Sequence, residues 1–101
     1  MFKKIRQFGK LSVGFQKSMQ SIHLKTPKFV ILVKDSNELA FKKTILAACE
    51  EKNIYVSQKV VKQLMAEVLG VKEKEAQVCC IIDWGERWTE LDKRMFEKWF
   101  L

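Results

Sequence analysis

Lys28-Phe29-Val30-Ile31-Leu32-Val33-Lys34-Asp35 is the stretch of sequence on which the rest of the fold depends. Its centre, Phe29 to Val33, is an unbroken run of β-branched, aliphatic and aromatic residues, bounded by Pro27 before it and by polar residues after it. A run of this kind is typical of a strand that is buried on both faces of a sheet. We therefore predict a central strand here.

Helical and strand patterns alternate on either side of this strand. Apolar residues at spacings of three and four predict five helices, and two further apolar runs predict strands. The expected helices span Met1–Phe8, Phe15–His23, Leu39–Cys49, a segment between Ser57 and Gly70, and residues 86–100, and the expected strands span Ile54–Val56 and Ala76–Ile82. This order favours an α/β fold, a three-layer α-β-α sandwich with a small mixed sheet.

Local residue chemistry predicts where these helices begin and end. Ser36 or Asn37 is expected to cap the helix that follows the central strand, and Ser57 is expected to cap the next one. Gly70 should stop that second helix in a left-handed conformation. The charged segment 72–75 is expected to be an exposed turn.

Length and composition predict a single domain over residues 1–101. The chain has 101 residues, of which 48% are apolar and 11% aromatic, enough for one core of ordinary size. The longest uncharged and largely apolar stretch, Phe29 to Val33, is far shorter than the roughly 20 residues of a membrane-spanning helix. We expect no membrane partner.

The net charge of +7 is concentrated in the first third of the chain. Residues 1–34 contain eight lysines and arginines and no acidic residue, whereas the remainder is nearly neutral. A one-sided basic segment indicates an anionic partner, which is a phosphate backbone, an acidic membrane surface or a receptor for presequences. The alternative is a solvated lysine-rich face that only maintains solubility.

Few residues are suited to catalysis. Cys49, Cys79 and Cys80 are expected to be buried, reduced thiols, because adjacent cysteines on a strand point to opposite faces. His23 is the only imidazole, and no cysteine pair has the spacing of a zinc site. We therefore predict a noncatalytic protein without a metal or another cofactor.

The best candidate for ligand binding is the start of the helix after Gly14. The amides at a helix N-terminus and its positive dipole favour anions, and glycine allows a phosphate to approach closely. Lys10 and Lys17 would contact phosphates, Gln16 and Gln20 would bond base edges, and Phe15 would stack on an unpaired base. The alternatives are a core position for Phe15 and solvated positions for the two glutamines.

The C-terminal segment is unusually aromatic. Trp84, Trp88, Trp99 and Phe100 exceed what one helical stripe of a small domain easily buries. They are candidates for a protein-docking surface. The alternative is that these rings complete the hydrophobic core.

Five segments in register resemble one family, the ribosomal-protein superfamily of L-seven-Ae and L-thirty-e. The most specific is Cys49-Glu50-Glu51-Lys52-Asn53-Ile54, which is similar to the family's helix-to-strand junction. The others are Gly9-Lys10-Leu11 through Gly14, Pro27 to Asp35, Leu64 to Val71, and Cys79 to Asp83. The resemblance implies an α-β-α sandwich that binds structured RNA, typically a kink-turn, within a ribosome or a related ribonucleoprotein particle.

The family's signature, Gly-Ala-Asn-Glu-x-x-Lys, aligns with residues 14–20. Gly14 is retained and Gln16 keeps an amide, but Lys17 stands where the family has glutamate and Gln20 where it has lysine. A lysine cannot accept hydrogen bonds from guanine edges as that glutamate does. The glycine-aromatic opening is instead similar to the L-thirty-e branch.

Two further sets of basic residues complete the predicted RNA surface. Lys28 belongs to the basic first third, and Lys72 and Lys74 lie in the charged loop whose family counterpart covers flipped bases. We expect a cytoplasmic, ribosome-associated protein. The start of the chain also resembles a mitochondrial presequence, so the mitochondrial matrix is the alternative. A protein-interaction module that has lost specific RNA binding is the alternative function.

Overall fold

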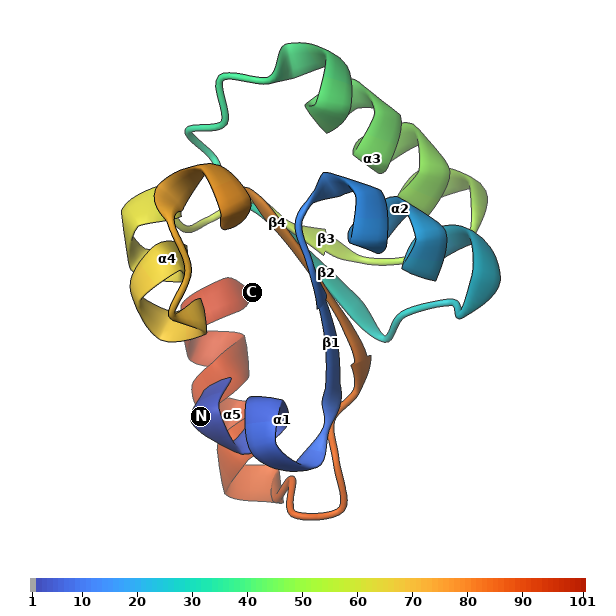
Figure 1. Ribbon diagram of the computed structural model, residues 1–101. Coiled ribbons are helices and arrows are strands. Elements are labelled where there is room, and N and C mark those ends of the chain that lie inside the picture. Colours follow the sequence, from blue (N-terminus) through green and yellow to red (C-terminus); the bar gives the residue numbers. More distant parts are fainter. Residues whose placement is uncertain (1) are drawn as a thin grey trace.

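The central apolar run forms the strand β2 (Phe29–Leu32), all four residues of which are buried. The computed structural model describes residues 2–101 (Figure 1). The other elements, in chain order, are α1 (Phe2–Phe8), β1 (Lys10–Val13), α2 (Phe15–Leu24), α3 (Leu39–Glu51), β3 (Val56–Ser57), α4 (Lys62–Leu69), the 3-10 turn η1 (Glu73–Glu75), β4 (Val78–Asp83) and α5 (Glu90–Phe100).

The four strands form one mixed sheet in the order β1-β4-β2-β3. The strand β4 is antiparallel to both β1 and β2, whereas β3 is parallel to β2. The central position predicted for β2 is confirmed. No helix within residues 2–101 is long and apolar enough to cross a bilayer.

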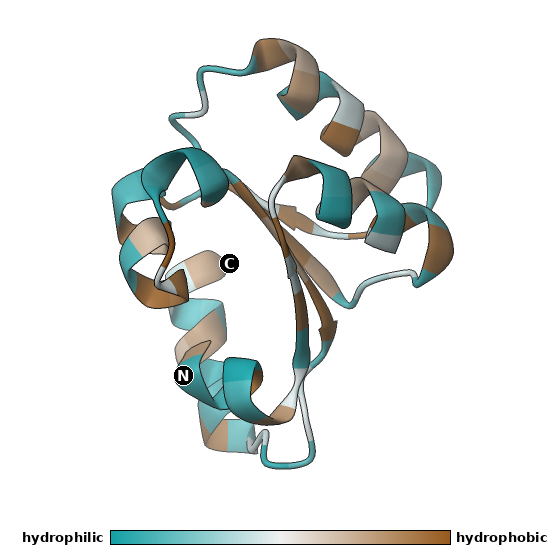
Figure 2. Ribbon diagram, viewed as in Figure 1, coloured by the Kyte–Doolittle hydropathy of each residue, from teal (hydrophilic) through white to brown (hydrophobic). Residues whose placement is uncertain are grey.

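The sheet divides the hydrophobic core in two, because successive side chains of a strand point to opposite faces. Ile31 and Cys79 pack with α1, α4 and α5 on one face. Val30 and Cys80 pack with α2 and α3 on the other. Figure 2 shows the most hydrophobic colour in the strands, with helices of mixed character outside them. The predicted three-layer α-β-α sandwich with a mixed sheet is confirmed.

Two predicted helix caps are wrong. The helix α3 begins at Leu39, and Ser36 donates its hydroxyl hydrogen to Gln77 instead of capping it. Ser57 is buried in β3, and the N-terminus of α4 is closed by a distant residue, since the Asp35 carboxylate accepts from the Lys62 N–H at 2.8 Å. Gly70 does stop α4 in the left-handed conformation, with φ 69° and ψ 35°.

The last helix, predicted over residues 86–100, begins later, at Glu90. Thr89 and Asp92 form a capping box, in which each side chain accepts from the other's backbone N–H. Asp92 also pairs with Lys4 at 2.7 Å, which joins α5 to α1. This hydrogen bond from Lys4, with the bond from the Thr89 backbone, lowers the pKa of Asp92 to about 2.

Three other boundaries differ from the sequence predictions. The expected strand Ile54–Val56 is the two-residue β3, which begins two positions later and ends one position later. The helix expected over Met1–Phe8 is present as α1, with Met1 outside the described residues. The apolar face expected on α3 is only partly buried: Ile45 and Cys49 are inside, but Leu39 and Phe41 are exposed.

The strand β1 was not predicted. Its four residues, Lys10-Leu11-Ser12-Val13, alternate polar and apolar side chains, but four positions between two helices are too few to distinguish a strand from a loop. They become a strand because they pair with β4, from Lys10 opposite Asp83 to Val13 opposite Cys79. This pairing places Gly14 at the edge of the sheet, at the point where α2 begins.

Candidate RNA-binding site

The N-terminus of α2 is open at Gly14. This residue has φ 95° and ψ 163°, a conformation that favours glycine, and its N–H donates to the Val78 carbonyl at 3.0 Å. A Cβ atom built on Gly14 would meet nothing within 4 Å, so the backbone angle and not crowding calls for glycine. No side chain caps the helix. The first amides of α2 therefore remain available to an anion.

The turn η1 lies beside this helix mouth. A groove of about 740 Å³ lies between the first turn of α2, α3 and η1, and is lined by Val13, Gly14, Phe15, Gln16, Lys17, Phe41, Val71, Lys74 and Glu75. A smaller pocket of about 120 Å³ adjoins it and shares Gly14, Phe15, Phe41, Lys74 and Glu75. We call this combined surface the α2 groove. It brings together three segments of the sequence, residues 13–17, Phe41 and residues 71–75.

Two aromatic rings form the wall of the α2 groove. Phe15 and Phe41 stack with their ring centroids 4.1 Å apart and their planes 19° from parallel. Phe15 is half-buried and packs against the core, whereas Phe41 is 43% exposed. The sequence predicts Phe15 as the ring that stacks on a base. In the structure Phe41, which we expected on the apolar face of α3, supplies the exposed ring of this pair.

The α2 groove has both charges. Lys17 and Lys74 are exposed, with ammonium groups that suit phosphates. Glu75 and Gln16 supply a carboxylate and an amide that suit base edges. A carboxylate acceptor, which Lys17 cannot provide from α2, is present in the groove on η1, at Glu75. Sequence reasoning missed Glu75 because only the fold places it there.

The other predicted RNA-binding residues lie apart from this groove. Lys10 and Lys28 are both near the far end of β4, since Lys10 is opposite Asp83 and the Lys28 N–H donates to the Ile81 carbonyl. Gln20 is exposed on the second turn of α2, and Lys72 is exposed just before η1. The single basic surface expected from residues 3–28 is thus divided between the two ends of the sheet.

The aromatic docking surface requires a larger correction. Phe100 is buried, with 2% of its surface exposed, and contacts the rings of Phe2 and Phe96. Trp84 and Trp88 are partly buried, stack on each other at 4.7 Å and pack against the core. These three rings therefore complete the hydrophobic core, which is the alternative that the sequence left open. Only Trp99 is exposed among the four predicted docking residues.

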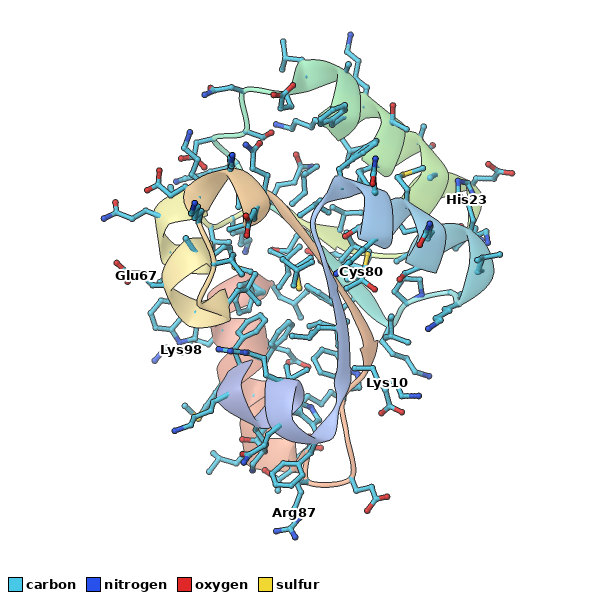
Figure 3. The ribbon with its side chains drawn as sticks, viewed as in Figure 1. Lys10, His23, Glu67, Cys80, Arg87 and Lys98 are labelled. Carbon is cyan, nitrogen blue, oxygen red and sulfur yellow. The ribbon has the colours of Figure 1, made fainter. Side chains whose placement is uncertain are left out.

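The cysteines are not placed for nucleophilic chemistry. All three are buried and unpaired, as predicted. Burial raises the pKa of Cys49 and Cys80 to about 11 and raises the pKa of Cys79 as well, so all three are neutral thiols. Figure 3 shows His23 at the outer end of α2 and Cys80 in the interior. Within residues 2–101, no group of three or more metal-ligating side chains is gathered around one point.

Comparison with known proteins agrees with the fold. A solved structure described as a protein with unknown function from Bacillus halodurans C superimposes with a TM-score of 0.69 at 20% identity, over 96% of this chain and 86% of that one. No curated protein matches the sequence significantly. The model of the Ribosomal protein L7Ae/L30e/S12e/Gadd45 family matches residues 1–88. The chain therefore belongs to the Ribosomal protein L7Ae/L30e/S12e/Gadd45 family.

Proposed function

We propose that this protein is a noncatalytic RNA-binding component of a ribosome or another ribonucleoprotein particle. Family membership supports the general class. The observation that carries the proposal is the α2 groove, where an uncapped helix N-terminus, two lysines and a pair of stacked aromatic rings meet. The helix N-terminus and the lysines suit a phosphate, and the aromatic rings suit a base.

We expect different residues of the α2 groove to contact the phosphate, the face of a base and the edge of that base. A phosphate would lie at the helix mouth, where the free amides of α2 and the ammonium groups of Lys17 and Lys74 favour negative charge. An unpaired base would stack on the exposed ring of Phe41. Gln16 and Glu75 would then bond the base edge, which gives the site a preference among sequences.

The finer proposal is a kink-turn-like RNA. Such an RNA presents both unpaired bases and bent phosphate backbones, and the α2 groove has partners for each. Glu75 would take the place of a carboxylate on α2, so we expect selectivity for guanine to depend on η1. We propose a cytoplasmic, ribosome-associated particle, with a mitochondrial matrix particle as the alternative.

Replacing Lys17 and Lys74 together by glutamine should weaken RNA binding about tenfold at moderate salt, because each lysine neutralises a phosphate and releases counterions. The slope of log affinity against log salt concentration should become shallower by about 2. Filter binding of a kink-turn RNA over a series of salt concentrations measures both quantities. The variant Glu75→Gln should instead reduce the preference for guanine at the unpaired position, with little effect on the slope.

The matched control is Lys43→Gln with Lys93→Gln, which removes the same charge from exposed positions on α3 and α5. This control should retain nearly the affinity and the salt dependence of the unsubstituted protein. Binding that does not weaken between low and moderate salt would contradict the proposal. Equal losses in the two double variants would show that net charge, and not the α2 groove, holds the RNA.

A second candidate function is protein docking through α5. Leu91, Met95 and Trp99 follow one another at spacings of four residues and are 66%, 45% and 55% exposed. They form an apolar stripe on the outer face of the helix, beside a pocket of about 240 Å³ that also involves Phe2, Leu64 and Val68. This stripe, which we call the α5 stripe, retains Trp99 from the four residues predicted from the sequence and has Leu91 and Met95 in place of the other three.

The second candidate predicts that purified protein carries no nucleic acid and associates through the α5 stripe. Sedimentation over a range of protein concentrations would then show self-association that Leu91→Glu weakens at least tenfold, because a buried charge opposes the contact. The control is Leu39→Glu, since Leu39 is also 66% exposed and lies on α3. An ultraviolet absorbance ratio typical of bound RNA, with no change in association for Leu91→Glu, would exclude this candidate.

A further inference from the structure

A second basic surface lies along the outer edge of β1, away from the α2 groove. Arg6 from α1, Lys10 from β1 and Lys25 from the end of α2 line one open hollow of about 510 Å³. The remaining residues around the hollow are uncharged: Gly9, Leu11, Ser12, Val13, Leu69 and Ile82. We call this the β1-edge surface. It gathers three cations with no carboxylate among its lining residues.

The positive charge continues along α1. Lys3 and Arg6 line the next hollow, so the basic surface extends from the start of α1 to the end of α2. Lys4 takes no part in it, since its ammonium is paired with Asp92. Figure 3 shows Lys10 at the start of β1, the end of the strand that is farther from α2 along the chain.

The backbone of β1 adds hydrogen-bonding groups to this edge. The strand has β4 on one side and no strand on the other within the described sheet. Because the Gly14 N–H donates inward to Val78, the antiparallel alternation turns the backbone groups of Leu11 and Val13 toward the outer edge. Three cations beside such an edge oppose its pairing with another protein strand. The same cations favour a polyanion.

Position along the strand links the two surfaces. The chain leads from Lys10 directly to Gly14, and four residues of extended strand span about 13 Å. Successive phosphates of one strand in an RNA helix are separated by much less than this distance. A nucleic acid held at the α2 groove thus reaches the β1-edge surface after a few nucleotides, with no change in the protein.

We propose that the β1-edge surface binds the phosphate backbone of a double-helical RNA stem that continues from the element held in the α2 groove. The inference rests on the proposed RNA-binding function and specifies its partner further. The RNA must have a paired stem that runs the length of β1. Arg6, Lys10 and Lys25 contact the stem without reading its sequence, since they meet only phosphates.

The test compares pairs of kink-turn RNAs that share the bent element and differ only in the length of one stem, with one pair for each stem. The triple variant Arg6→Gln, Lys10→Gln, Lys25→Gln should bind the long-stem RNA about ten- to thirtyfold more weakly, with a salt slope shallower by about 2 to 3. On the RNA that lacks the contacted stem, the loss should be less than about twofold, because the phosphates that these residues meet are absent.

The matched control is Lys43→Gln, Lys93→Gln, Arg94→Gln, which removes the same charges from exposed positions on α3 and α5. Since the Arg6 guanidinium lies against Gly70, the double variant Lys10→Gln, Lys25→Gln serves as a second test that leaves this packing intact. It should show about two thirds of the change in slope. Thermal unfolding by circular dichroism confirms that each variant is folded.

The possible failures are distinct. If the unsubstituted protein binds neither RNA, the proposed function fails and the inference fails with it. If it binds both RNAs and the triple variant behaves like the control, or weakens both RNAs equally, the β1-edge surface holds no stem and only the inference is overturned. If RNA binding by the triple variant is unchanged and an extended peptide binds at β1, the inference is overturned in favour of pairing with a peptide strand.

Discussion

Replacing Phe96 by alanine is expected to lower the free energy of unfolding by about 3–5 kcal/mol, the largest change we predict for a single side chain. Phe96 is 2% exposed and lies at the centre of the core beneath α5. Its ring centroid lies 4.6 to 6.1 Å from those of five other aromatic residues, Phe2, Phe29, Trp84, Trp88 and Phe100. Its removal leaves a cavity whose rigid walls cannot close.

Urea unfolding followed by circular dichroism measures this change. Phe96→Leu fills most of the space and should cost less than about 1.5 kcal/mol. Phe8→Ala is the exposed control, since Phe8 is 46% exposed, and should cost less than about 1 kcal/mol. Equal midpoints for Phe96→Ala and Phe8→Ala would show that α5 is not packed on the sheet as described.

Replacing Gly9 by alanine is expected to destabilise the fold by about 3 kcal/mol, because the added methyl group has no room. Its Cβ would lie 2.3 Å from the Asp83 carbonyl oxygen and 2.8 Å from that of Trp84. A third backbone oxygen, that of Ile5, would be 2.9 Å away. Since all three atoms belong to the backbone, the clash is relieved only by separating α1 and β1 from the end of β4.

Gly70→Ala is the matched control for this substitution. Gly70 has φ +69°, but a Cβ there would meet nothing closer than the Arg6 side chain at 3.5 Å. The cost should be about 1 kcal/mol, the ordinary cost of a left-handed alanine. Thermal unfolding of the two variants distinguishes crowding from backbone strain. Similar losses in both would contradict the close approach at Gly9.

Local sequence predicts those elements whose residue types by themselves require a particular burial or backbone conformation. The strand β2 is apolar at every position, so it is stable only with both faces covered, and the sequence alone predicts a central strand. Gly70 ends α4 because few other residues adopt that conformation easily. In contrast, the pairing of β1 with β4 and the Asp35 cap of α4 depend on partners far away in the sequence, and no local pattern specifies those partners.

The same distinction explains the outcome for the site. Gly14, Gln16 and Lys17 are neighbours in sequence, so the helix mouth was predicted together with its side chains. The aromatic residues of the C-terminal segment are placed differently from the prediction, because Trp84 and Trp88 precede α5 and pack against the core, and Phe96 and Phe100 occupy the buried face of α5. Phe100 is buried as a result, and Leu91 and Met95 are exposed.

For the basic first third of the chain, the sequence determines some properties and the tertiary structure determines others. Its charge, its freedom from acidic residues and its glycine at a helix start are properties of the sequence, and they already indicate an anionic partner. Only the tertiary structure determines how that charge is distributed. The pairing of β1 with β4 places Lys17 in the α2 groove beside Lys74, and it places Arg6, Lys10 and Lys25 together at the other end of the strand. Charge follows from composition, whereas a binding surface requires long-range pairing to fix the distances between charges.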